Sequence, residues 1–153
     1  MAIRSPLRRG RLAAVAFLGA TTLAVPLTAL AQPTPEGVWR TIDDETGRPR
    51  SLVRIWEHEG VLYGKIEELF DDPNALCEKC EGTQKNQPVL GMLVLWGMQP
   101  DPDDASQWEG GTLFDPEKGK TYRGKLELQD PDTLEVRGFI GPFSREQTWH
   151  RIQ

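Results

Sequence analysis

Short runs of alternating apolar and polar residues recur from residue 37 onward, and turn-forming residues separate them. In Thr121–Leu128, for example, Leu126 and Leu128 fall on the face opposite Lys125 and Glu127. A period of two places successive side chains on opposite faces of a strand, one face dry and the other wet. The pattern predicts eight strands: Gly37–Ile42, Ser51–Glu57, Val61–Leu69, Leu90–Trp96, Trp108–Phe114, Lys120–Gln129, Thr133–Phe139 and Glu146–Arg151.

Most links between these runs are short and rich in Gly, Pro or Asp, as in His58–Gly60, Asp115–Gly119 and Asp130–Asp132. Short links make neighbouring strands pair antiparallel. We therefore predict an all-β fold, an eight-stranded up-and-down barrel, with a two-sheet β-sandwich as the alternative. Two links are longer, Phe70–Val89 and Gly97–Gln107, and a connection as long as the first usually has a function.

The first 31 residues have the pattern of an export signal. Leu12–Leu30 carries no charge and leads into Ala29-Leu30-Ala31, a small-x-small cleavage site. A basic head, an apolar middle and such an exit are typical of a secretory signal peptide. We predict cleavage after Ala31, with a retained membrane anchor as the alternative and twin-arginine export as another route. The basic head consists of Arg4, Arg8, Arg9 and Arg11.

Cleavage would leave one acidic domain, residues 32–153, in the periplasm or outside the cell. Four of the 18 basic residues and none of the 23 acidic ones precede residue 32, which leaves 14 against 23 and a net charge of −9. A field of that sign repels phosphate backbones and anionic membrane surfaces. Nucleic acid is therefore a poor candidate partner, and we expect no stable membrane insertion.

Several motifs follow one another in a fixed order after the signal. They are Pro35-Glu36-Gly37-Val38-Trp39, Leu62-Tyr63-Gly64-Lys65-Ile66, Cys77-x-x-Cys80-x-Gly82, Lys85-Asn86-Gln87-Pro88, Trp108-Glu109-Gly110-Gly111, Asp115-Pro116-x-x-Gly119-Lys120-Thr121-Tyr122, Leu134-x-Val136-Arg137-Gly138 and Trp149-His150-Arg151. In this order and spacing the chain resembles the bacterial secreted family catalogued as domain of unknown function 2147. The resemblance implies an exported protein with a lipocalin-like barrel, and it carries no agreed activity.

The resemblance also implies one checkable contact. Lipocalins begin with Gly-x-Trp on the first strand and end with a basic residue over the indole ring. Gly37, Trp39 and Arg151 are placed to do the same here. An Arg on an indole face contributes about 0.5–2 kcal/mol. An ordinary core Trp and a surface Arg are the alternative.

Cys77 and Cys80 are the two cysteines of the chain. In an exported protein we expect them to form a disulfide, which closes a very small loop and by chain entropy contributes about 2 kcal/mol. We therefore predict that it shapes the Phe70–Val89 connection and does little to staple the fold. A thioredoxin-like role is disfavoured because Glu78 and Glu81 oppose a thiolate. Zinc would need further ligands nearby.

Other candidate chemistry is sparse. His58 and His150 lie far apart, and no Ser or Cys nucleophile stands in a recognisable elbow. The Asp71-Asp72 and Asp101–Asp104 clusters lack the spacing of a calcium loop and form turns readily. We therefore expect no catalytic residues, no metal and no cofactor.

Ligand binding is the leading hypothesis that remains. Lys85 and Gln87 end the long connection, and Trp56 and Trp108 fall near strand ends, where indoles can line a barrel mouth. We predict that these four residues contact a small apolar or amphipathic ligand, and that alanine at Lys85 and Gln87 weakens its binding.

The three glycines on presumed inner faces either kink strands or leave room for the ligand; they are Gly64, Gly124 and Gly138. The alternative function is an envelope interaction protein with a solidly packed barrel, and the third is an enzyme. A cavity of roughly 300 Å³ or more would favour the carrier.

Overall fold

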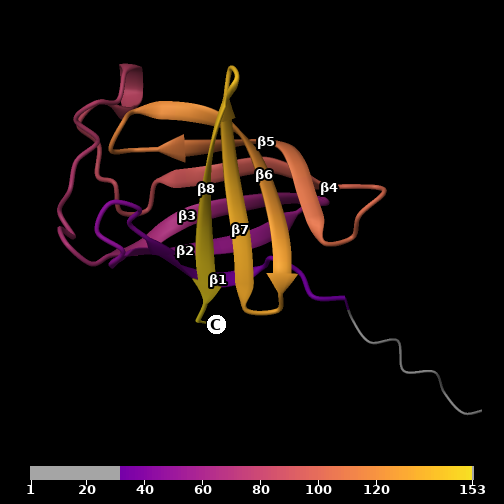
Figure 1. The fold of residues 1–153 in the computed structure, drawn as a ribbon. Helices are drawn as coiled ribbons and strands as arrows, with labels where there is room; N and C mark the ends of the chain where they lie inside the picture. Colours follow the sequence, from indigo (N-terminus) through magenta and orange to yellow (C-terminus); the bar gives the residue numbers. More distant parts are fainter. Residues whose placement is uncertain (1–31, 153) are drawn as a thin grey trace, which may run out of the picture. The chain divides into compact units, whose positions relative to one another are not determined.

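In the computed structural model, which describes residues 32–152, eight antiparallel strands close into a barrel in chain order (Figure 1). The strands are β1 (Gly37–Ile42), β2 (Pro49–His58), β3 (Val61–Leu69), β4 (Leu93–Pro100), β5 (Gln107–Asp115), β6 (Lys120–Asp130), β7 (Thr133–Ile140) and β8 (Phe143–Arg151), with one 3-10 turn, η1 (Gly82–Gln84). The barrel prediction is confirmed and the sandwich alternative is wrong. The predicted signal peptide, residues 1–31, lies outside the described residues.

The predicted strands agree with the observed ones except at a few ends. The largest difference is β4, which begins at Leu93 rather than Leu90 and runs on to Pro100. Its start is delayed because Gly91 has φ +82° and the amide of Met92 donates to the carbonyl of Val89, which forms a turn. Apolar composition alone could not distinguish this turn from a strand.

The predicted alternation of faces is confirmed in β6 and β7. Leu126 faces Val136 and Leu128 faces Leu134 across the two strands, and all four are buried. Neighbouring apolar pairs of this kind stabilise a sheet because they pack on the same face. They form part of the core that fills the barrel.

Two of the three inner-face glycines make room for core side chains. A Cβ at Gly124 would lie 1.9 Å from the Cε of Met98, and one at Gly64 would lie 3.1 Å from the Cβ of Leu95. Met98 and Leu95 are fully buried. The space beside these glycines is therefore occupied by protein.

The barrel closes at one short seam. Within the described residues, β1 pairs with β8 at Trp39–Arg151 and Arg40–His150, whereas β7 pairs with β8 at eight positions. The guanidinium carbon of Arg151 lies 4.3 Å from the centre of the Trp39 ring. Its Nη2 donates to the carbonyl of Thr34 at 2.7 Å, and the Trp39 indole donates to the carbonyl of Pro35 at 2.7 Å. The predicted contact between Trp39 and Arg151 is confirmed.

The long β3–β4 connection folds back against the β5–β6 turn. Cys77 and Cys80 form a disulfide, both are buried, and the Cys77 Sγ lies 3.1 Å from the carbonyl oxygen of Pro116. A Cβ at Gly119 would lie 2.1 Å from the carbonyl oxygen of Lys79. The disulfide loop is thus packed against the rest of the barrel, whereas the sequence predicted that the disulfide would do little to hold the fold together.

In residues 32–152 no helix has the length and apolar character to cross a membrane.

Candidate functional site

A cavity of about 270 Å³ lies inside the barrel at one end. Three segments meet at this end: the β1–β2 loop (43–48), the β3–β4 connection (70–92) and the β5–β6 turn (116–119) (Figure 1). We call it the open end. The volume is slightly below the roughly 300 Å³ at which small-molecule pockets begin. Apolar side chains from seven strands and the connection line it: Val53, Ile66, Leu69, Ala75, Leu76, Val89, Val94, Leu113, Phe114, Val136 and Trp149, with Gly138 and the ring of Tyr122.

The apolar wall contains one pair of hydroxyl groups. Thr41 and Ser51 face each other across β1 and β2, and their oxygens are 2.7 Å apart. Both side chains are buried, and the Thr41 hydroxyl also lies 3.4 Å from the carbonyl of Ser51. A buried hydroxyl without a partner would be costly, so the two hydroxyls satisfy each other. Rotation of either hydroxyl can instead present a hydrogen bond to a bound molecule.

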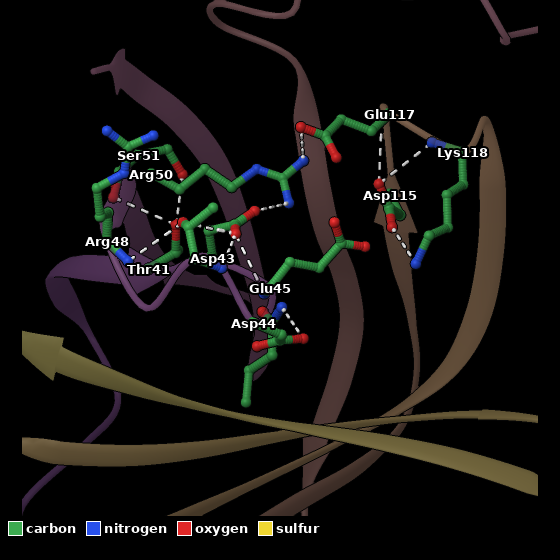
Figure 2. Close-up of polar contacts among 12 residues, drawn as sticks. Thr41, Asp43, Asp44, Glu45, Arg48, Arg50, Ser51, Asp115, Glu117 and Lys118 are labelled. Atoms are coloured by element: carbon green, nitrogen blue, oxygen red, sulfur yellow. Dashed lines mark hydrogen bonds and ion pairs between the residues drawn. The ribbon is translucent and has the colours of Figure 1, made fainter. Parts of the chain in front are cut away.

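Arg50 spans one side of the open end and connects two segments (Figure 2). Its guanidinium forms an ion pair with Glu117 of the β5–β6 turn and lies 3.9 Å from a carboxylate oxygen of Asp43. Nearby, Asp115 pairs with Lys118 at 3.6 Å. These side chains therefore fix the turn beside the β1–β2 loop.

Asp43 organises the β1–β2 loop itself. Its carboxylate accepts the Thr46 hydroxyl at 2.8 Å and the backbone amides of Thr46 and Glu45 at 2.7 and 3.1 Å. The hydrogen bond from the Thr46 hydroxyl is the largest cause that lowers the pKa of Asp43. The loop is therefore held by the charged form of this carboxylate.

We expect the β1–β2 loop to become less ordered as the pH falls. A lowered folded-state pKa means that the stabilisation is complete above the pKa of the unfolded chain and is lost as pH falls through the folded value. The amide chemical shift of Thr46, followed by NMR, should titrate with a midpoint below the ordinary aspartate value of about 3.9. A midpoint at or above that value would contradict the assigned hydrogen bonds.

On the other side, a chain of contacts joins the loop to the cavity wall. The Asp44 carboxylate accepts the Nε of Arg145 at 2.5 Å and the amide of Gln147 at 3.0 Å. The Gln147 side-chain oxygen accepts the indole N–H of Trp149 at 3.2 Å. Burial opposes the charge of Arg145, yet the hydrogen bond and charge of Asp44 raise the pKa of the guanidinium above its usual value. These side chains cover the region where β8 runs on without pairing to β1.

None of the four residues predicted to contact a ligand lines this cavity. Trp56 stacks on Tyr63 with ring centres 5.8 Å apart, because alternation in β2 directs Val53 and Ile55 inward and Trp56 outward. Trp108 is buried, but it pairs with Leu126 and Pro100, away from the open end.

The β3–β4 connection places other residues at the cavity than the two that the sequence predicted. A bridge between Leu76 and Pro88 folds it on itself, so that Leu76 and Val89 face the cavity. Lys85 instead donates to the carbonyl of Glu78, and Gln87 is exposed. The structure therefore does not bring Lys85 and Gln87 to the cavity wall.

Sequence reasoning missed the polar residues that do line it. Arg145, Gln147 and Trp149 follow one another with period two, which indicates one face of β8. The same period from Trp39 points to Thr41. The alternation of residues was visible in the sequence, but it could not show which end of the barrel holds the cavity and which end is filled.

The two histidines lie elsewhere. His58 and His150 are exposed and neither lines the cavity. Across residues 32–152, no three His, Cys, Asp or Glu side chains gather in an arrangement that could hold a metal ion.

The comparisons with known proteins agree with this architecture. The structure is similar to a Helicobacter pylori protein, HP1028, described as belonging to the lipocalin family, with a TM-score of 0.70 and 19% identity over 80% of this chain and 85% of that one. At this identity the likeness concerns the fold. A search of curated proteins finds no match. The family model described as "Uncharacterized protein conserved in bacteria (DUF2147)" matches residues 37–151. The chain therefore belongs to the DUF2147 family, and its barrel is lipocalin-like.

Proposed function

We propose that this domain binds a small, partly apolar molecule inside its barrel and acts as a carrier in the bacterial cell envelope, without catalysing a reaction. The observation that carries the proposal is the cavity of about 270 Å³, walled by apolar side chains and open at one end. An interior packed to the usual density would leave few voids larger than a water molecule. The cavity falls slightly short of the roughly 300 Å³ expected of a carrier, but a solidly packed barrel would leave no void of this size, so it supports a carrier over an interaction protein with a solid barrel.

The polar groups at the cavity support binding rather than chemistry. The Thr41 and Ser51 hydroxyls bond to each other, and neither His58 nor His150 reaches them. A nucleophile needs a base within hydrogen-bond reach. The hydroxyl pair instead suits the role of orienting a ligand.

Two features support the envelope as the compartment. The disulfide between Cys77 and Cys80 is buried, and disulfides persist in oxidising compartments such as the periplasm. The predicted signal peptide would direct the chain there. Detection of the mature chain, starting at Gln32, in a periplasmic extract would test this part of the proposal.

A single substitution should remove binding by filling the cavity. Val136 lies on β7 with its side chain buried in the cavity wall. Val136→Trp extends an indole into the empty volume, so we expect the affinity for the fluorescent apolar probe N-phenyl-1-naphthylamine to fall by more than about tenfold. Overpacking typically costs no more than about 1–3 kcal/mol, so the variant should still fold.

The matched control is Val61→Trp, which makes the same change in a half-buried residue at the β2–β3 turn, outside the cavity lining. The control should bind the probe like the natural protein, and so should Lys85→Ala. Equal binding by Val136→Trp and Val61→Trp would show that the probe does not occupy the barrel. Native mass spectrometry of the protein purified from periplasm then identifies any molecule it carries.

A further inference from the structure

Charged residues surround the open end of the cavity, and their balance is negative. The lining contains two guanidinium groups, those of Arg50 and Arg145, against four carboxylates, those of Asp71, Asp72, Asp115 and Glu117. A bound molecule with its apolar part in the barrel must leave any charged part here, because burying an unpaired charge among aliphatic side chains is very costly. The excess of negative charge at this end therefore favours some classes of ligand over others.

Both guanidinium groups are already engaged by the protein's own carboxylates. Arg50 pairs with Glu117 and lies near Asp43, and Arg145 pairs with Asp44, which also accepts a hydrogen bond from Gln147. An anionic ligand would have to compete with these carboxylates, or bind the remaining N–H groups of a guanidinium beside a carboxylate that repels it. The arginines thus offer little to a carboxylate or phosphate head group.

Two carboxylates remain available. Within residues 32–152, no basic nitrogen lies within 4.0 Å of the Asp71 or Asp72 carboxylate, whereas Asp115 pairs with Lys118. Asp72 accepts the backbone amide of Asn74 at 2.9 Å, which leaves its charge uncompensated. Both residues begin the β3–β4 connection, are exposed and line the cavity at its open end.

We infer that the ligand of this cavity is a cationic amphiphile, an alkyl or aryl chain that ends in a protonated amine, with the chain in the barrel and the ammonium group at Asp71 and Asp72. This inference rests on the proposed carrier function and names the ligand class for the same cavity. A volume of about 270 Å³ holds on the order of nine groups the size of a water molecule, which sets the length of the chain.

Three probes with the same chain and different heads test the inference: decylamine, decanol and decanoate, titrated into the full protein at pH 7 by isothermal calorimetry. The amine is protonated and the acid ionised at this pH. We expect the order decylamine, decanol, decanoate from tightest to weakest, with the amine about three- to tenfold tighter than the acid at low salt. The difference should shrink as salt is raised, because the carboxylates are exposed.

A double variant that removes both charges distinguishes an effect of this site from an effect of the protein's overall negative charge. Asp71→Asn combined with Asp72→Asn should bring decylamine close to decanol and leave decanol unchanged. The control is Asp103→Asn, which removes a charge in the β4–β5 connection, away from the cavity lining, and should leave all three affinities as they were.

The outcomes distinguish the two proposals. If decanoate binds as tightly as decylamine, or if the Asp71/Asp72 variant keeps the preference, the cationic ligand class is wrong while the carrier function stands. If none of the three probes binds, the carrier function at this cavity fails as well.

Discussion

Trp39→Ala is expected to lower the free energy of unfolding by about 3–5 kcal/mol, the usual cost of removing a fully buried aromatic side chain. Trp39 is completely buried in β1, and its indole N–H donates to the carbonyl of Pro35. It also supports Arg151, which pairs with it at the seam. Chemical denaturation followed by far-UV circular dichroism would measure the loss.

A double-mutant cycle separates the contact from the burial. Arg151→Ala alone removes the guanidinium over the ring together with its bonds to the carbonyls of Thr34 and Pro131. The coupling between Trp39→Ala and Arg151→Ala should be about 0.5–2 kcal/mol, as for an Arg stacked on an indole. A coupling near zero would mean that the stacked geometry contributes no stability.

The second large effect is expected at the β5–β6 turn. Gly119 has φ +61°, and a Cβ there would lie 2.1 Å from the carbonyl oxygen of Lys79 and 3.0 Å from the amide of Cys80. Backbone atoms cannot move aside as the end of a side chain can. Gly119→Ala should therefore cost about 2–4 kcal/mol, from the left-handed conformation and the clash together, and displace the disulfide loop.

Gly47→Ala is the matched control for this substitution. Gly47 has a similar φ of +69°, but a Cβ there would meet no atom within 4 Å. It should therefore cost about 1 kcal/mol, from the backbone conformation alone. Equal losses of stability for the two variants, measured by thermal unfolding, would refute the packing of the connection against the turn.

The barrel could be predicted from the sequence because it depends on local rules. Alternation in 121–128 and 133–140 indicated half-buried strands, and the short link at 130–132 made them neighbours. The number of antiparallel strands indicated closure, and the contact between Trp39 and Arg151 was implied by the family resemblance. The start of β4 was predicted three residues early, because the turn at Gly91 depends on a hydrogen bond from its amide to the carbonyl of Ile66, a contact across the fold.

The candidate site was much harder to predict, because the two ends of a barrel look alike in sequence. Trp108 and Trp149 are both buried aromatic residues on inward-facing positions, yet Trp149 lines the cavity and Trp108 does not. Which end is filled depends on side chains such as Met98, which occupies the space beside Gly124. The turned-back path of residues 70–92 depends likewise on tertiary packing against the β5–β6 turn.

The seam between β1 and β8 has a consequence for the order of events in the cell. Arg151 hydrogen-bonds to Glu36, a residue 115 positions earlier, so the barrel can close only after almost the whole domain has been synthesised. Loop-closure entropy makes such a distant contact slow to form. A nascent chain that still lacks its last strand therefore has no native closed state. The domain can therefore reach its closed fold only when its last strand has been synthesised.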